Sequence, residues 1–233
     1  MLVFFDIDAT LITTGGVGIN AMVDAGAELF GAGFNADGVE FAGRLDPLIL
    51  CDLLAANGQT PTTENLSRMR AGYRRHLERR LRTGVGRVLP GVGPLLTRLA
   101  TDESTTLGVL TGNFPDTGTM KLSACGIDVD VFSIRVWGDE SPYTPPAREH
   151  LPPIGMQRYA DRTGRTVTPD RVVIIGDTPH DISCARAHGC KSVGVATGKF
   201  STQQLAAAGA DMAVPTLSDT DAITAWITRG GHG

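Results

Sequence analysis

The chain opens with Leu2-Val3-Phe4-Phe5-Asp6-Ile7-Asp8-Ala9-Thr10-Leu11, and this stretch guides the interpretation of the rest. Its four apolar residues before Asp6, two of them aromatic, are typical of a strand buried on both faces. Asp6 ends the apolar run, and Asp8 follows one residue after Ile7. In an open α/β sheet, ligands bind just beyond the carboxyl ends of the strands. The stretch therefore predicts a buried strand that presents Asp6 and Asp8 at a functional edge.

Two later segments repeat this pattern of an apolar strand followed by polar residues. A strand predicted at 106–110 leads into Thr111-Gly112-Asn113, and one at 171–176 leads into Asp177-Thr178-Pro179-His180-Asp181. Taken alone, the first aspartates are equally compatible with an ordinary turn, because Asp favours turn positions. Polar residues at three strand ends favour a shared site.

These motifs, in this order, resemble those of the haloacid dehalogenase-like superfamily, most of whose members are Mg²⁺-dependent phosphohydrolases. Asp6 to Thr10 is similar to the first motif, Thr111 to Asn113 to the second, and Gly176 to Asp181 to the fourth. The resemblance spans nearly the whole chain and implies a Rossmann-like core. It does not indicate a particular substrate.

Composition limits the class of protein further. The 233 residues are enough for one large domain, or for one domain with a smaller companion. A net charge of −4 argues against general binding of nucleic acid, which needs a clustered positive field. No stretch approaches the ~20 apolar residues of a membrane span, and no basic leader precedes the first strand.

The chain has four cysteines, and none forms a Cys-x-x-Cys pair, which indicates reduced thiols, although their spacing is also compatible with a disulfide. We therefore expect a cytoplasmic protein, a monomer or a homodimer. Its expected partner is a small phosphorylated metabolite, and we expect it to bind neither nucleic acid nor a membrane.

Two glycine-rich stretches, 15–18 and 83–86, enclose a segment that is helical in pattern throughout. Helices are predicted from about Ile19 to Phe30, from Arg44 to about Asn57, and again after Thr60 and Pro61, which form a good cap and first-turn pair. The third helix is rich in arginine. Because the whole chain is acidic, we interpret these arginines as a solvated helix face rather than a nucleic-acid patch.

Outside this segment, predicted strands alternate with helices, which indicates a parallel sheet with helices on both faces. We expect an α/β protein with a Rossmann-like catalytic core of residues 1–14 and 87–233. An all-helical domain of residues 15–86 is inserted in it, with the two glycine stretches as hinges. In the superfamily, an insertion at this point is a cap that closes over the active site.

The resemblance assigns a role to each of the first two aspartates. Asp6 is expected to be the nucleophile that attacks phosphorus and forms an aspartyl-phosphate. Asp8 is expected to protonate the leaving oxygen and later to take a proton from water. Superfamily members that remove halide have no acid at this position, so Asp8 favours phosphoryl transfer over dehalogenation.

The resemblance also implies a Mg²⁺ site. Asp6, the backbone carbonyl of Asp8, and Asp177 are its expected ligands, and carboxylate oxygens suit this hard cation. Asp181 is a candidate ligand or a partner of the ligands. A carboxylate that only faces the N-terminus of its helix is the equally good alternative for Asp181.

Phosphate binding is expected from Thr111, Gly112 and Asn113, because they open a helix whose free N–H groups favour an anion. The third motif of the superfamily is usually a lysine, and here the chain departs from the pattern. Arg148 stands at the expected place, and a guanidinium binds phosphate bidentately. Lys121 is less suitable, since it lies about two turns into its predicted helix, roughly 10 Å from the loop.

The inserted segment contains no lysine, which argues against the phosphonate-cleaving branch, whose members use a cap lysine. Arg44 is our candidate for a cap residue that touches substrate. An arginine at a helix N-terminus that only contacts solvent is the equally good alternative.

The sequence thus predicts a Mg²⁺-dependent phosphatase that cleaves a small phosphomonoester. A phosphomutase of the same superfamily, which returns the phosphoryl group to a sugar, is the first alternative. A phospho-binding relative that does not turn over is the second, and the departure at the third motif is what supports it.

Overall fold

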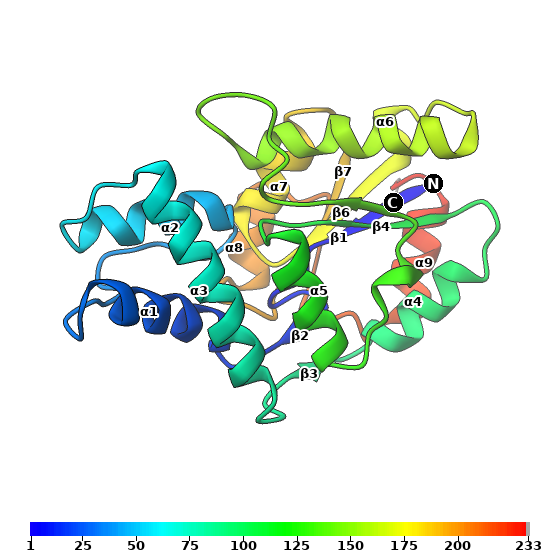
Figure 1. The fold of residues 1–233 in the computed structure, drawn as a ribbon. Helices are drawn as coiled ribbons and strands as arrows, with labels where there is room; N and C mark the ends of the chain where they lie inside the picture. The colour runs from blue at the N-terminus through cyan, green and yellow to red at the C-terminus, as the bar shows by residue number, and fades with distance from the viewer. Residues whose placement is uncertain (232–233) are drawn as a thin grey trace.

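The computed structural model describes residues 1–231, and its centre is a sheet of six parallel strands in the order β5-β4-β1-β6-β7-β8 (Figure 1). The first strand therefore lies in the middle of the sheet, hydrogen-bonded to β4 on one side and β6 on the other. The strands are β1 (Leu2–Phe5), β4 (Thr106–Leu110), β5 (Ile134–Val136), β6 (Val172–Gly176), β7 (Lys191–Val195) and β8 (Met212–Val214).

Helices cover both faces of this sheet, as the alternation of predicted strands and helices indicates. Leu2 and Phe4 of β1 pack toward Leu151 and Cys184, on the face that α6 and α7 cover. Val3 and Phe5 pack on the opposite face, against α4, α5 and α9. Successive side chains of a strand point to opposite faces, so the buried run of β1 serves two cores at once.

The helices of this α/β part are α4 (Val92–Ala100), α5 (Pro115–Ala124), α6 (Leu151–Thr163), α7 (Pro179–Arg186), α8 (Thr202–Ala207) and α9 (Thr220–Thr228). Three single turns of 3₁₀ helix accompany them: η1 (Val129–Val131), η2 (Arg148–His150) and η3 (Pro169–Arg171). The prediction of an α/β fold with a Rossmann-like core is confirmed.

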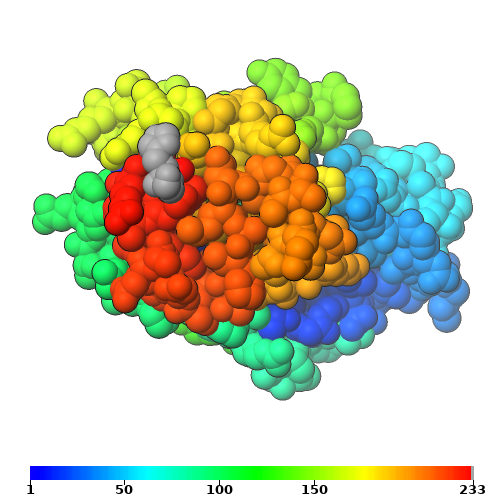
Figure 2. Space-filling view, turned by 180° about the vertical axis from the view of Figure 1, so that it is seen from behind, coloured from blue at the N-terminus to red at the C-terminus, as the bar shows by residue number. Residues whose placement is uncertain are grey.

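A separate group of helices, α1 (Val17–Phe30), α2 (Asp46–Ala56) and α3 (Thr63–Leu81), lies beyond one end of the sheet (Figure 1). Seen from behind, it projects at the side of the C-terminal part of the chain (Figure 2). It has an apolar core of its own, which Phe114 of the α/β part enters and against which Met120 packs. We call residues 15–86 the cap segment below; that they form a separate domain stays a prediction.

The two connections to the cap segment pair with each other. β2 (Ile12–Thr13) and β3 (Arg87–Val88) form an antiparallel ribbon of two strands. The sequence pattern did not predict this ribbon, because two residues are too few for an alternation to be recognised. It lies just outside the two glycine-rich stretches and brings the ends of the cap segment together.

The predicted cap at Thr60 and Pro61 is wrong. Helix α3 begins at Thr63, and the Thr62 hydroxyl accepts a hydrogen bond from the Asn65 N–H. Thr60 instead forms a tight turn, in which its carbonyl accepts from the N–H of Thr62 and from the Asn65 side chain. Within residues 1–231, no helix is both long enough and apolar enough to cross a membrane.

Candidate active site

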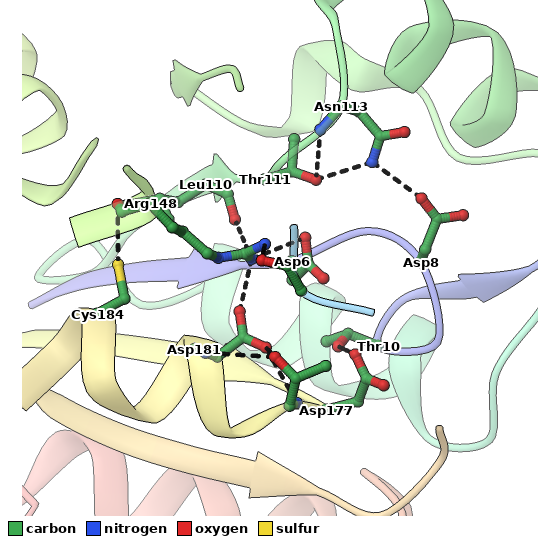
Figure 3. A network of polar contacts seen from close by, with 12 residues as sticks. Asp6, Asp8, Thr10, Leu110, Thr111, Asn113, Arg148, Asp177, Asp181 and Cys184 are labelled. Carbon is green, nitrogen blue, oxygen red and sulfur yellow. Dashed lines mark hydrogen bonds and ion pairs between the residues drawn. The ribbon is translucent and has the colours of Figure 1, made fainter. Parts of the chain in front are cut away.

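Side chains from four segments meet at the carboxyl edge of the sheet (Figure 3). Asp6 follows β1, Thr111 follows β4, Arg148 lies in η2, and Asp177 follows β6. Because β1 lies between β4 and β6, the ends of these three strands are neighbours. All four side chains are buried, between 0% and 6% exposed.

Three buried carboxylates, of Asp6, Asp177 and Asp181, form a cluster in which one oxygen of each lies within 4.8 Å of the others. Burial raises the pKa of Asp6 to about 6, and Asp181 adds to this while Arg148 opposes it. Burial likewise raises the pKa of Asp177 to about 8, with the neighbouring carboxylates Asp181 and Asp6 as the next causes. These groups repel one another, so a cation between them would stabilise the cluster.

Asp181 lies both at the N-terminus of a helix and in the acidic cluster. One of its carboxylate oxygens accepts from the N–H and the hydroxyl of Thr178, at 3.0 and 2.7 Å, and so caps the N-terminus of α7. Its other oxygen accepts from Nη2 of Arg148 at 2.5 Å. The carboxylate of a helix cap thus also belongs to the acidic cluster.

Arg148 contacts the first aspartate directly, with Nη2 at 3.1 Å from Asp6 Oδ1. The same guanidinium donates to the backbone carbonyls of Gly43 and Leu110 at 3.2 and 3.4 Å. Its buried Nε has no partner among the described residues. An arginine that stands where the superfamily pattern has a lysine is therefore placed beside Asp6, held by the cap segment and by β4.

Asp8 lies on the other side of the site from the acidic cluster (Figure 3). The turn that carries it holds Ala9 at a φ of 57°, a left-handed conformation that is uncommon for alanine. Its carboxylate accepts from Asn113 Nδ2 at 2.9 Å and from Lys121 Nζ at 2.7 Å. The Asp8 side chain stays 43% exposed, and it lines the cavity described below.

Lys121 is a residue that the sequence analysis set aside. Its ammonium is buried and donates both to Asp8 and to Asn113 Oδ1, at 2.7 and 2.6 Å. It starts two turns into α5, as expected, but side chains on a helix point back toward its N-terminus. A distance estimated from the helical rise per residue ignores this direction. The side-chain direction is the signal that could have identified Lys121.

The second-motif residues are arranged tightly around one another. The Thr111 hydroxyl accepts from Nδ2 and from the N–H of Asn113, at 2.9 and 3.4 Å. The Gly112 carbonyl accepts from the Asp46 N–H at 2.7 Å, and a Cβ on Gly112 would lie 2.0 Å from the Arg44 carbonyl oxygen. A side chain at position 112 would therefore separate the cap segment from the core.

The cap segment contributes two buried polar residues that the sequence analysis did not single out. Asp46 accepts from the N–H of Phe114 at 3.2 Å, and burial raises its pKa to about 7 although Lys121 opposes this. Tyr73, in α3, has a buried hydroxyl that makes no hydrogen bond among the described residues. Both line the cavity.

Arg44 also lines the cavity, but its guanidinium forms ion pairs with acidic residues of the cap segment. The guanidinium lies 2.7 Å from Asp52 and 3.7 Å from Glu40. The structure therefore places Arg44 at the site without a free charge.

A cavity of about 300 Å³ lies between the cap segment and the carboxyl edge of the sheet. Asp6, Asp8, Thr111, Asn113 and Arg148 line it on one side. Residues of the cap segment, among them Gly18, Ile19, Met22, Phe41 and Ile49, line it on the other. This volume is at the lower end of ordinary ligand sites, which favours a small ligand.

The donor set of the acidic cluster fits a hard divalent cation. Three carboxylates converge there, and Mg²⁺ binds through one or two carboxylates together with water and phosphate oxygens. Arg148 supplies one positive charge beside them, which leaves net negative charge in a buried place. Asp6, Asp177 and Asp181 are thus the residues that could hold such a metal.

Comparisons with known proteins agree with the fold. A family model described as HAD-hydrolase-like matches residues 151–220. No curated protein sequence matches the chain.

Several solved structures share the fold over nearly the whole chain. CbbY from Rhodobacter sphaeroides, a mutant in complex with xylulose-(1,5)bisphosphate, is 18% identical, with a TM-score of 0.76 and coverage of 94% of this chain and 95% of that one. A predicted phosphoglycolate phosphatase from Haemophilus somnus is 19% identical, with a TM-score of 0.71 and coverage of 96% and 97%. The β-phosphoglucomutase of Clostridium difficile is 16% identical, with a TM-score of 0.70 and coverage of 98% and 96%.

At these identities the solved structures show the fold alone, and the family model adds agreement in sequence over 151–220. The resemblance to the haloacid dehalogenase-like superfamily that the motifs indicated is thereby confirmed. The matched residues include helix α6, which follows the turn that carries Arg148, and strand β6. They also include the segment Gly176 to Asp181, which carries two of the three clustered carboxylates.

Proposed function

We propose that the protein is a Mg²⁺-dependent phosphohydrolase, which cleaves a small phosphomonoester through an aspartyl-phosphate on Asp6. The observation that carries the proposal is the position of Asp6. Its carboxylate stands at the end of the central strand, 3.1 Å from Arg148, inside the acidic cluster and beside the cavity. Phosphatases and phosphomutases of this fold act on small phosphorylated substrates, and the cavity is of that size.

Asp6 would be the nucleophile because it belongs to the acidic cluster, lines the cavity and contacts Arg148. Contact with Arg148 favours its ionised form, which is the form that attacks phosphorus. Arg148 and the Thr111 hydroxyl would hold the phosphoryl oxygens, since both line the cavity beside Asp6. The free Nε of Arg148 is a further donor at this place.

Asp8 would serve as general acid and base. It is two residues from Asp6, faces the same cavity and is partly exposed, so it can reach a leaving oxygen or a water. Its hydrogen bonds to Asn113 and Lys121 hold it on the side away from the acidic cluster. Such a role is typically worth ~10²–10⁴-fold in rate.

Asp6, Asp177 and, for its backbone carbonyl, Asp8 are the residues we propose as holding Mg²⁺, with Asp181 beside them. When bound, the cation would neutralise charge on the phosphoryl oxygens and on the attacking carboxylate.

A phosphomutase is the second candidate, because the β-phosphoglucomutase of C. difficile shares the fold over nearly the whole chain. The two activities use the same residues and differ in whether water or a sugar accepts the phosphoryl group. Incubation with a sugar monophosphate separates them: a phosphatase gives free sugar and inorganic phosphate, and a mutase gives an isomeric sugar phosphate.

Release of p-nitrophenol from p-nitrophenyl phosphate tests the proposal, with Mg²⁺ and with EDTA, alongside Asp6→Asn. We expect turnover that requires Mg²⁺ and disappears in the variant. If the protein shows no turnover with any divalent metal and does not bind a phosphate mimic in a Mg²⁺-dependent way, the proposal is wrong. Binding of the mimic without turnover would point to the non-catalytic relative.

A further inference from the structure

The hydroxyl of Tyr73 is an unpaired donor at the cap side of the cavity. Tyr73 is 0% exposed and lines the cavity, and its hydroxyl lies close to the Thr117 side chain without a hydrogen bond of ordinary length to any described residue. A buried hydroxyl without a partner costs free energy. A ligand that accepts this hydrogen bond would recover that cost.

Lys121 offers a second donor at the same place. An ammonium carries three N–H groups, and Lys121 uses one on Asp8 and one on Asn113. An atom placed as a Cβ on Gly18 would lie 3.3 Å from Lys121 Nζ and 3.7 Å from the Tyr73 hydroxyl. The two donors therefore lie close together beside Gly18, where both residues line the cavity.

The charges around this space do not favour a second anion. The Lys121 ammonium is 2.7 Å from the Asp8 carboxylate, so its charge is already balanced. Asp46 is a further acidic group close to both Lys121 and Tyr73. Arg44 is paired with Asp52. The exposed Lys199 also lines the cavity, and it follows Gly198, where an added Cβ would meet Asp177 of the acidic cluster.

The remaining walls on the cap side are mostly apolar, formed by Ile19, Met22, Phe41 and Ile49. They suit the carbon atoms of a small alcohol. The cap side of the cavity thus combines an apolar wall with two neighbouring donors and no net positive charge.

We propose that Tyr73 and Lys121 form a subsite for the leaving group, where they donate hydrogen bonds to one neutral oxygen, a hydroxyl, on the small alcohol of the phosphomonoester. This inference rests on the proposed phosphohydrolase function and adds a substrate class to it. The subsite is shared between α3 of the cap segment and α5 of the core. A substrate that occupies it would therefore bridge the two parts.

The test compares matched esters by the release of inorganic phosphate. The probes are 2-hydroxyethyl and 3-hydroxypropyl phosphate, each against the ester with a methyl group in place of the hydroxyl, propyl and butyl phosphate. Phosphoglycolate supplies a carboxylate, and p-nitrophenyl phosphate is the reference for catalysis. We expect kcat/KM to favour at least one hydroxylated ester over its partner by about tenfold or more.

Tyr73→Phe removes the hydroxyl and keeps the ring. We expect this preference ratio to fall toward one in the variant. Gly18→Ala would place a Cβ 3.3 Å from both Cε and Nζ of Lys121, so the end of the lysine side chain has to shift, and we expect the same ratio to fall. Its matched control is Gly93→Ala in α4, where an added Cβ meets nothing within 4 Å. Alanine suits both helical positions better than glycine does, so folding is retained.

Two results would overturn the subsite. One is a preference ratio that stays the same in Tyr73→Phe, as a purely structural role of the ring would give. The other is a wild-type protein that favours phosphoglycolate over both hydroxylated esters by tenfold or more. Failure of the proposed phosphohydrolase function gives a different result from failure of the subsite alone. No phosphate would then be released from any ester, p-nitrophenyl phosphate included, and the subsite proposal would be wrong as well.

Discussion

Arg148 contacts Asp6, and we expect the shape of its guanidinium to matter for the reaction as well as its charge. The group reaches two carboxylates and two backbone carbonyls at once. A lysine ammonium is a point charge and cannot span these partners. We expect Arg148→Lys to lower kcat/KM by about tenfold or more and Arg148→Met by about a hundredfold or more.

Steady-state kinetics at saturating Mg²⁺ would measure these losses, with thermal unfolding as a check on folding. Arg98→Lys is the control. Arg98 lies in α4, far from the site, and forms an exposed ion pair with Asp221 of α9. Wild-type kcat/KM in Arg148→Met would mean that Arg148 has no part in the reaction.

Asp46 makes the free energy of unfolding depend on pH, and this dependence can be measured without substrate. Burial raises its pKa to about 7 from an ordinary value of 3.8, so the folded chain binds this proton more tightly than the unfolded chain does. Stability from this group is therefore present below about pH 4 and is lost as the pH rises through about 7. The loss is of the order of 1 kcal/mol per pH unit over that window.

Asp46→Asn removes this dependence and can still accept from the Phe114 N–H. We expect the free energy of unfolding of the variant, relative to wild type, to increase between about pH 4 and pH 7 and then to level off. Urea unfolding in EDTA at several pH values measures this difference. A difference that does not vary with pH would show that Asp46 is ionised in the folded protein.

Single residues also show where sequence reasoning reaches its limit. Asp6, Thr111, Arg148 and Asp177 were predicted together because each follows a strand or precedes a helix in a recognisable pattern, and the fold brings them together. Lys121 was set aside on its distance along α5, although the side chains of a helix point back toward its N-terminus and so toward the site. Tyr73 carries no local pattern, because its place at the cavity depends on how α3 packs against the core.

At the scale of elements, the loop after β7 supports the acidic cluster through a glycine. A Cβ on Gly198 would lie 1.8 Å from Asp177 Oδ2, so a side chain there would displace this carboxylate. We expect Gly198→Ala to weaken Mg²⁺ binding by about tenfold or more while the fold is kept. Calorimetric titration with Mg²⁺ measures this effect directly.

Gly93→Ala serves as its control, since an added Cβ there has open space. Equal Mg²⁺ affinity in Gly198→Ala and wild type would contradict the assignment of Asp177 as a ligand.

Strands and helices of the core were predicted well because their apolar runs are long and bounded by turn residues. The shortest elements were missed: β2 and β3 have two residues each. Helix α9 was not predicted either. β5 spans only Ile134–Val136, and just before it Val129–Val131 forms a 3₁₀ turn that Asp128 caps. Local hydrogen bonds decide such boundaries.

At the scale of the whole molecule, ion pairs join the cap segment to the core. Arg70 of α3 lies 3.2 Å from Asp139 and 3.9 Å from Asp116, and it stacks over the Phe114 ring. Arg74 lies 3.4 Å from Asp116. The sequence suggested that the arginine-rich face of α3 is solvated. Part of this face instead holds the cap segment against the core.

Replacing Arg70 and Arg74 together by glutamine removes these pairs. We expect KM to rise several-fold, because the cap segment closes less favourably over the substrate. We expect the free energy of unfolding to change by less than about 4 kcal/mol, since the three ion pairs and the stacking over Phe114 are each worth ~1 kcal/mol or less. Arg68→Gln, on the same helix, is the control, and unchanged KM in the double variant would contradict a closing role.

The most direct measurement of the central claim is the time course of p-nitrophenyl phosphate turnover by Asp8→Asn with Mg²⁺. p-Nitrophenolate leaves without a proton, so the variant can still transfer the phosphoryl group to Asp6, but it lacks the base that activates water. We predict a burst of about one p-nitrophenol per protein, slow turnover afterwards, and a phosphoryl group on the peptide that contains Asp6, detected by mass spectrometry. Linear release without a burst, or a phosphoryl group on another residue, would contradict Asp6 as the nucleophile.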